Sequence, residues 1–426
     1  MEAESKVASP SPEGKALPTP LPSSSPTAED TRRSEGPPAL FNCHCFLTDS
    51  VFPVVGAVLL LAALPYLALQ VILCTAVHKV LDFVGLIGLV KRAVSWEGFE
   101  PLVKHPGDGF IFPCMLWLCF AMPLLCLSEA LHAREHGFVL WRAAAYNALR
   151  IGPMYAFFSH IYTLAHKESH ARGAIFVAPL NSLGLGNVFN WVGGPFFGVL
   201  PGTFTHSHQL NHHRYHNSRA DVYSTGGYPR DSLVSFCRYF CIWLMYASNF
   251  STTIALLAEG KWLIAAEVVG ATLYYCAMVA AVAYISPAWA AASMVWAFVE
   301  GNVLLCAVNW VWHGFIAPED PTDPAVVSTT IVKGKEFIFA EEFHVVHHAF
   351  PGLHWTRYAE MYKKSAEAGT YKRALRFQDE NLFVVWGCML AKDYAGLAKL
   401  VHDPQGDWDP AEIPKILAAR LQHTTW

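Results

Sequence analysis

The apolar stretch at residues 51–77 limits the possible folds of this chain most strongly. It contains no Asp, Glu, Lys or Arg, and about 20 apolar helical residues are enough to span the hydrocarbon core of a bilayer. Further long apolar stretches lie at residues 111–127, 262–285 and 288–312. Within a bilayer, helices satisfy their own backbone hydrogen bonds. The sequence therefore predicts an all-α fold, a polytopic transmembrane helical bundle.

The composition of the chain agrees with a membrane protein. Only 15% of the residues are charged and 53% are hydrophobic, whereas soluble domains are about 25% charged. The net charge of −4 gives no support for nucleic-acid binding and leaves lipid as the expected partner. Most of the 11 cysteines lie inside apolar stretches, which indicates buried thiols and not a disulfide framework.

The chain divides into three predicted segments. Residues 1–45 are rich in Pro, Ser, Glu and Ala and predict a disordered N-terminal tail. Residues 46–360 predict a membrane-embedded domain that carries all of the histidine motifs, and residues 361–426 predict a C-terminal helical tail in the cytosol. The sequence begins Met-Glu-Ala-Glu, which fits neither a signal peptide nor a transit peptide. The endoplasmic reticulum is therefore favoured over a plastid membrane.

Residues 138–162 form another apolar stretch, interrupted by Arg142 and Arg150. A charge inside a span is unfavourable, so we expect both arginines near a helix end or facing a polar interior. We expect this helix to emerge from the membrane with His166 and His170 at its tip.

The segments on either side of the later histidines do not all have to cross the membrane. Residues 174–202 are broken by several Pro, Gly and Asn residues, which favours an in-plane or re-entrant segment. Residues 262–312 predict a hairpin that turns at Pro287. All of the histidine motifs can share one membrane face only if residues 232–258 are largely interfacial.

Nine histidines stand in spacings that are typical of metal ligands. The motifs are HxxxH at His166 and His170, HxxxHH at His208, His212 and His213, NxxxH at Asn309 and His313, and HxxHH at His344, His347 and His348. Residues three and four apart lie on one face of a helix, so we expect the last three imidazoles to converge. Neutral imidazole binds iron, zinc, copper and nickel.

Nine histidines are too many for one metal ion but suit two ions with four or five nitrogen ligands each. No Cys or carboxylate stands at a motif position, which argues against structural zinc. The remaining polar residues near the motifs are expected to support the ligands or to lie on the surface: His160, His206, His216, His354, Glu168, Asp221, Glu341 and Glu342.

These motifs resemble the histidine boxes of the membrane fatty acid desaturase/hydroxylase superfamily, over roughly residues 138–360. The NxxxH motif is similar to the additional ligand motif of acyl-CoA desaturases and bacterial alkane monooxygenases. The resemblance implies a His-rich di-metal site facing the cytosol, with two iron ions, O₂ as co-substrate and an external electron donor, either a b-type cytochrome or a ferredoxin. It also implies that Asn309 holds a metal-bound water.

The resemblance implies O₂-dependent desaturation of a lipid acyl chain. The alternative is a hydroxylase of an acyl chain, an alkane or a sphingoid base, because the HxxxHH spacing matches alkane monooxygenases whereas desaturases usually have HxxHH. Both reactions begin with the removal of one hydrogen; loss of a second gives a double bond, and return of oxygen gives an alcohol. A third hypothesis is a membrane metal-binding protein without catalytic activity.

Overall fold

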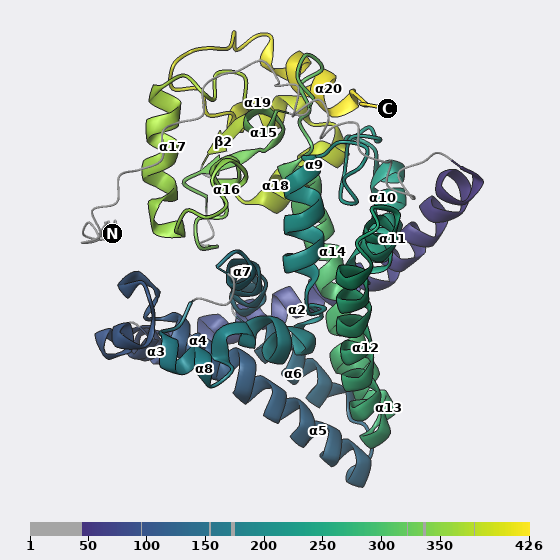
Figure 1. Ribbon diagram of the computed structural model, residues 1–426, viewed down its shortest axis with the longest axis vertical. Coiled ribbons are helices and arrows are strands. Elements are labelled where there is room, and N and C mark those ends of the chain that lie inside the picture. The colour runs from purple at the N-terminus through teal and green to yellow at the C-terminus, as the bar shows by residue number, and fades with distance from the viewer. Residues whose placement is uncertain are drawn as a thin grey trace.

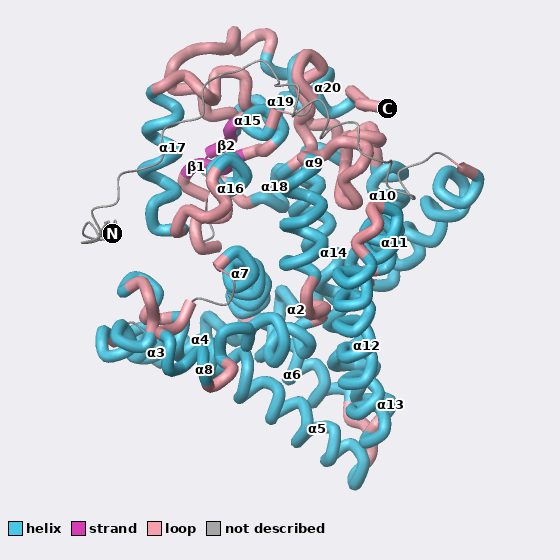
Figure 2. The backbone as a smooth tube through the Cα atoms, viewed as in Figure 1, coloured by secondary structure: helices cyan, strands magenta, loops and turns pink. Residues whose placement is uncertain are grey.

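A computed structural model of the protein describes residues 45–426 except 95, 153–154, 172–174, 322, 335–337 and 379. Residues 1–44 of the predicted tail lie outside the described residues. The chain is 71% helical with almost no sheet, which confirms the predicted all-α class. The sequence analysis does not predict the short parallel pair of strands β1 (Thr330–Val332) and β2 (Arg376–Gln378), which Figure 2 shows surrounded by helices.

The described helices follow in chain order, and η marks the 3₁₀ and π helices among them. The first group is η1 (Leu47–Val51), α2 (Phe52–Phe83), α3 (Leu86–Val94), η2 (Glu97–Leu102), η3 (Pro106–Asp108), α4 (Ile111–Met115), η4 (Leu116–Ala121) and α5 (Met122–His136). The second group is α6 (Leu140–Ile151), α7 (Ala156–His170), α8 (Ala178–Ser182), η6 (Leu185–Asn187), η7 (Phe189–Gly193), η8 (Gly194–Phe197), η9 (Thr203–His212) and α9 (His213–Tyr215).

Two further groups complete the chain. The third is α10 (Leu233–Ala247), α11 (Phe250–Ala258), α12 (Trp262–Ile285), α13 (Pro287–Ala290), η10 (Ala291–Val295) and α14 (Trp296–Trp312). The fourth is α15 (Pro324–Val327), α16 (His344–Ala349), η11 (Trp355–Arg357), α17 (Tyr358–Glu367), α18 (Leu382–Ala391), α19 (Tyr394–Leu400) and α20 (Ile413–Gln422).

Four helical segments among the described residues are long and apolar enough to cross a membrane: Leu47–Phe83, Pro106–His136, Trp262–Ile285 and Pro287–Trp312. They contain the four long apolar stretches of the sequence. Many of their apolar side chains point outward, as Leu61 and Leu263 do with 71% and 83% exposure. Exposed apolar surface of this extent is what lipid would cover.

The hairpin predicted at residues 262–312 is present. The Ser286 side chain accepts a hydrogen bond from the backbone of Trp289, and Pro287 occupies the first helical turn, where its missing N–H is not needed. The preceding pair α10 and α11 is bent by 70° at Asn249, whose φ is +63°. A pair bent in this way can be a broken span or a re-entrant loop, so the expected interfacial position of residues 232–258 stays a prediction.

The prediction of one continuous helix through residues 138–162 was wrong. The chain turns at Gly152, whose φ of +70° is readily adopted only without a side chain, and α6 and α7 are separate helices. α7 has 15 residues and is not among the helices long and apolar enough to cross a membrane. His166, near its end, therefore does not lie at the tip of a spanning helix. Arg150 is fully buried and pairs with Glu300 of α14.

The arrangement of the helices places α7 at the centre of the molecule. Figure 1 shows α7 between a layer that contains α4, α5, α6 and α8 and an upper part formed by α15 to α20. The upper part is attached through the hydrophobic core, where Val385 and Met389 of α18 pack in the same cluster as Trp310 of α14. This attachment holds the end of α14, just before His313, against the upper part. The three-segment division of the chain stays a prediction.

Candidate metal centre

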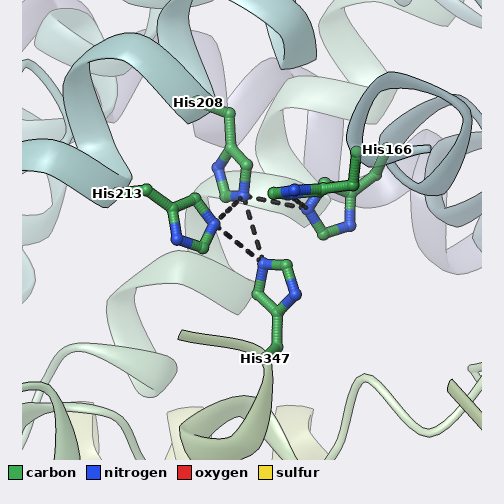
Figure 3. Close-up of side chains that lie close together, drawn as sticks. His166, His208, His213 and His347 are labelled. Atoms are coloured by element: carbon green, nitrogen blue, oxygen red, sulfur yellow. Dashed lines mark hydrogen bonds between the residues drawn. The ribbon is translucent and has the colours of Figure 1, made fainter. Parts of the chain in front are cut away.

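Five histidines from three segments form the first group of converging imidazoles. We call His166, His170, His208, His213 and His347 the five-histidine group; one nitrogen of each lies within 4.8 Å of the others. α7 supplies the first two, η9 and α9 the next two, and α16 the last. Figure 3 shows the rings of His166, His208, His213 and His347 pointing toward one another.

The spacing of these nitrogens fits a shared metal ion. His208 Nε2 lies 2.9 Å from His166 Nε2, 2.9 Å from His213 Nε2 and 3.4 Å from His347 Nε2. A neutral imidazole nitrogen carries either one proton or one lone pair, so it cannot hydrogen-bond to three neighbours. Two nitrogens each about 2.1 Å from one metal, at right angles, would lie about 3.0 Å apart. The observed spacing therefore matches metal ligation better than hydrogen bonding.

The second group adjoins the first. One nitrogen each of His212, His313 and His348 lies within 4.8 Å of the others. His344 Nε2 lies 3.1 Å from the Nε2 atoms of both His313 and His348, so we call these four residues the four-histidine group. The rings of His213 and His348 stack with centroids 4.6 Å apart. The nine predicted histidines thus divide into adjacent sets of five and four.

The rings of His344, His347 and His348 lie close together, with centroids 4.5 to 5.8 Å apart, but the three residues divide between the two groups. His344 and His348, one helical turn apart, belong to the four-histidine group, while His347 points to the five-histidine group. In α7, too, the partners of one group are four residues apart. Residues three and four apart share one face of an α-helix, so helical spacing brings His347 close to both partners but does not decide which group it joins.

The second motif reaches the same division with a different helix. η9 is a π-helix, whose hydrogen bonds join residues five apart. His208 and His213, five apart, therefore share the five-histidine group, and His212 joins the four-histidine group. The π-helical form of η9 therefore accommodates the HxxxHH spacing within the two groups.

Burial keeps the histidines neutral, which is the form that binds metal. Burial lowers the pKa of His347 well below its ordinary value, and neighbouring histidines lower it further. The same two causes act on His208 and His348. Burial lowers the pKa of His170 to about 4, with a smaller contribution from Lys167. Burial lowers the pKa of eight of the nine histidines, so these imidazoles are crowded without the repulsion that protonation would bring.

Three polar contacts support the ligands from outside. His212 Nδ1 lies 2.7 Å from Asp221 Oδ2, and His347 Nδ1 lies 3.3 Å from the hydroxyl of Tyr358. Glu341 Oε1 lies 3.8 Å from His166 Nδ1 and accepts a hydrogen bond from Lys167 at 2.5 Å. Such partners set the tautomer and orientation of a ligating imidazole. Asp221 and Glu341 were predicted in this role, whereas Tyr358 was missed because it stands in no recognisable motif.

Glu168 does not play the predicted role. Its carboxylate accepts hydrogen bonds from the backbone of Phe189 and Asn190 at 3.2 and 2.8 Å. It therefore fastens α7 to η7 and does not orient a histidine. Among the described residues, no hydrogen bond joins Glu342 to a histidine.

Asn309 lies beside the histidines, but its side-chain amide is engaged elsewhere. Asn309 Nδ2 donates to the hydroxyl of Tyr239 at 2.7 Å and to the carbonyl of Tyr223 at 3.3 Å. These bonds direct the amide nitrogen away from a metal. Its predicted role in holding a metal-bound water stays a prediction.

Three of the four flanking histidines have polar partners outside the two groups. His354 Nε2 lies 3.0 Å from Asp108 Oδ2, His206 lies 3.7 Å from Glu267, and the His160 ring nitrogen lies 2.5 Å from the carbonyl of Ala156. The fourth, His216, adjoins the four-histidine group, with its ring tilted against that of His348 and the two centroids 5.6 Å apart.

A largely apolar cavity of ≈ 110 Å³ borders both histidine groups. Its wall includes His166 and His208 of the five-histidine group and His212 and His344 of the four-histidine group. The rest of the wall comes mainly from apolar and aromatic residues, among them Val199, Leu200, Phe204, Tyr223, Trp243, Leu305 and Val308. An apolar chain in this cavity would lie against both groups.

Comparison with known proteins gives one family match. No curated protein and no solved structure matches the chain. The model of the fatty acid desaturase family matches residues 140–379, which is more than half of the chain and includes all nine histidines. Together with the four apolar helical segments, this match indicates a membrane protein. The chain belongs to the fatty acid desaturase family.

Proposed function

We propose that this protein is a membrane oxidoreductase that desaturates a lipid acyl chain with O₂, using two iron ions held by the five-histidine and four-histidine groups. The observation that carries the proposal is the apolar cavity bordered by both groups. Iron with O₂ and electrons supplies the oxidant that an unactivated C–H bond requires and that no side chain can provide.

The residues of the cavity would bind and orient the chain. Phe204, Leu305 and Val308 present apolar surface, so the shape of the cavity determines which carbons lie next to the histidines. His208 and Trp243 are buried, and exclusion of water protects a reactive centre from side reactions. Both groups would hold the metal ions through imidazole nitrogens.

The reaction requires a source of electrons. Removal of two hydrogens from the chain yields two of the four electrons that reduce O₂ to two waters. The other two electrons come one at a time from a donor, which we propose to be a separate b-type cytochrome or ferredoxin, and two protons come from solvent. We also propose that the enzyme resides in the endoplasmic reticulum membrane with the histidine groups facing the cytosol.

Lipid mass spectrometry tests the reaction directly. In cells that express the wild-type protein together with a reductase and its donor, we expect a lipid species lighter by two hydrogens. His347→Ala should abolish this species, because a buried imidazole of the five-histidine group is lost while no spanning segment is changed. His136→Ala, an exposed histidine at the end of α5, is the matched control and should retain full activity.

Other outcomes would contradict the proposal in different ways. A product heavier by one oxygen would identify a hydroxylase. Full turnover by the His347→Ala variant would exclude that residue as a ligand. An unchanged lipid profile, together with purified protein that holds one loosely bound zinc ion and no iron, would favour a metal-binding protein without catalytic activity.

A further inference from the structure

The loop between α9 and α10, residues 217–231, is buried although it contains no helix or strand. We call it the bridging loop; only Arg219 and Pro229 in it are exposed. A buried loop must satisfy its backbone polar groups internally. The Asn217 side chain does part of this by accepting hydrogen bonds from the backbone of Thr225 at 2.7 Å and from the hydroxyl of Ser224 at 3.1 Å.

One side of the bridging loop holds the four-histidine group. Asp221 contacts His212 Nδ1. The hydroxyl of Thr225 donates to the backbone carbonyl of His313 at 2.5 Å. Arg230 Nε donates to the carbonyl of Gly314, the next residue, at 3.0 Å. Two histidines of the group therefore depend on this loop for their position.

The other side of the bridging loop is held by residues 420–426. The backbone of Thr425 donates to the carbonyl of Gly226 at 2.8 Å. The Trp426 ring lies against two glycines: a Cβ built on Gly227 would lie 2.5 Å from Trp426 Nε1, and one on Gly226 would lie 2.8 Å from a ring carbon. Neither glycine has a positive φ, so the backbone conformation does not require glycine at these positions. The absence of a side chain there instead leaves room for the indole ring of Trp426.

We propose that Trp426 is a positioning residue for the four-histidine group and acts through the bridging loop. The contacts run from Trp426 to Gly226 and Gly227, from there to Thr225, and from Thr225 to His313. Arg230 adds a parallel connection, because its guanidinium also donates to the carbonyl of Arg420 at 2.6 Å. The inference rests on the proposed function only in taking the four-histidine group as a metal site.

Iron(II) titration of purified protein in two backgrounds tests this role. In the first, His166→Ala and His347→Ala disable the five-histidine group; in the second, His313→Ala and His348→Ala disable the four-histidine group. Adding Trp426→Ala should weaken iron(II) binding about tenfold or more in the first background, as the loss of support around a ligand does. It should leave the iron(II) affinity of the second background unchanged.

Further variants separate positioning from general loosening of the upper part. Trp426→Phe should restore most of the affinity, and Gly227→Ala should act like Trp426→Ala, with no additional loss when both are combined. Trp408→Ala is the matched control, because this tryptophan of the same upper part stacks on Arg420 at 5.1 Å. It should lower thermal stability without changing the iron(II) affinity of the first background.

Two results would overturn the inference while leaving the metal centre intact. One is an iron(II) affinity of the first background that Trp426→Ala leaves unchanged. The other is a loss of iron(II) affinity in Trp408→Ala as large as that in Trp426→Ala. Absence of iron(II) binding by the wild-type protein and by both backgrounds would instead overturn the proposed metal centre, and the positioning role with it.

Discussion

At the scale of single residues, the four-histidine group depends on Asp221, a fully buried carboxylate. Asp221 Oδ2 contacts His212 Nδ1 at 2.7 Å and accepts from the backbone of Asn217 at 2.8 Å, while Oδ1 accepts from the backbone of Tyr223 at 2.8 Å. A carboxylate fixed in this way keeps the proton on Nδ1 and leaves the Nε2 lone pair for a metal.

Asp221→Asn should lower the iron(II) affinity of the four-histidine group by about 10- to 100-fold. The amide has nearly the same shape but lacks the negative charge that makes the imidazole a stronger ligand, and its NH₂ group opposes one of the backbone donors. Iron(II) titration with the five-histidine group disabled measures the change.

Glu168→Gln is the matched control for this substitution. Glu168 is equally buried, but its carboxyl accepts from backbone groups of η7. Burial raises the pKa of Glu168 to about 8, although hydrogen bonds from Asn190 lower it, so a neutral side chain is tolerated there. An equal loss of affinity in both variants would show that any buried carboxylate matters and that the contact with His212 does not.

At the scale of elements, a buried ion pair joins the two helices that lead to the histidine groups. Arg150 of α6 pairs with Glu300 of α14, and both side chains are fully buried. Arg150 Nε also donates to Asn147 Oδ1 at 3.1 Å. α6 precedes α7 with His166, and α14 ends just before His313, so the pair links the supports of both groups.

Glu300→Ala should lower the free energy of unfolding by about 3–5 kcal/mol, because it leaves the Arg150 guanidinium buried without its partner. Chemical unfolding in mixed micelles measures this change. The double variant Arg150→Met with Glu300→Leu should be clearly less destabilised, since it removes both charges and retains apolar volume. A double variant as unstable as Glu300→Ala would contradict the role of the unpaired charge.

At the scale of the whole molecule, metal binding should be coupled to folding. The nine histidines come from segments spread between residues 166 and 348, and they meet only when α7, η9, α14 and α16 are assembled. An ion that binds the folded chain but not the unfolded chain raises the free energy of unfolding. At concentrations above its dissociation constant, this increase grows with the logarithm of the ion concentration.

Iron(II) at 100 times its dissociation constant should raise the free energy of unfolding by about 2.7 kcal/mol for each occupied group. A chelator should reverse the increase. Thermal unfolding followed with and without iron(II) measures it, and a variant with all four substitutions of the two backgrounds above is the control. Equal stabilisation of that variant would place the binding elsewhere.

The sequence by itself determined the features that depend on local pattern. The length of the apolar stretches predicted the helical segments 47–83 and 106–136, and Pro287 predicted the turn of the hairpin. The four motifs identified all nine histidines that the structure brings together, because imidazole at helical spacing is uncommon outside metal sites. The match to the family over residues 140–379 agrees with that interpretation.

Tertiary structure alone decided how the histidines are shared. Which group receives His347 depends on what faces α16 from α7 and η9, and the π-helical form of η9, which pairs His208 with His213, has no signature in the motif. The break at Gly152 and the actual partners of Glu168 are likewise set by packing between distant segments. Spacing along a chain constrains residues within one helix, but it carries no information about the neighbour across the interface, and at this centre that neighbour decides the role of each residue.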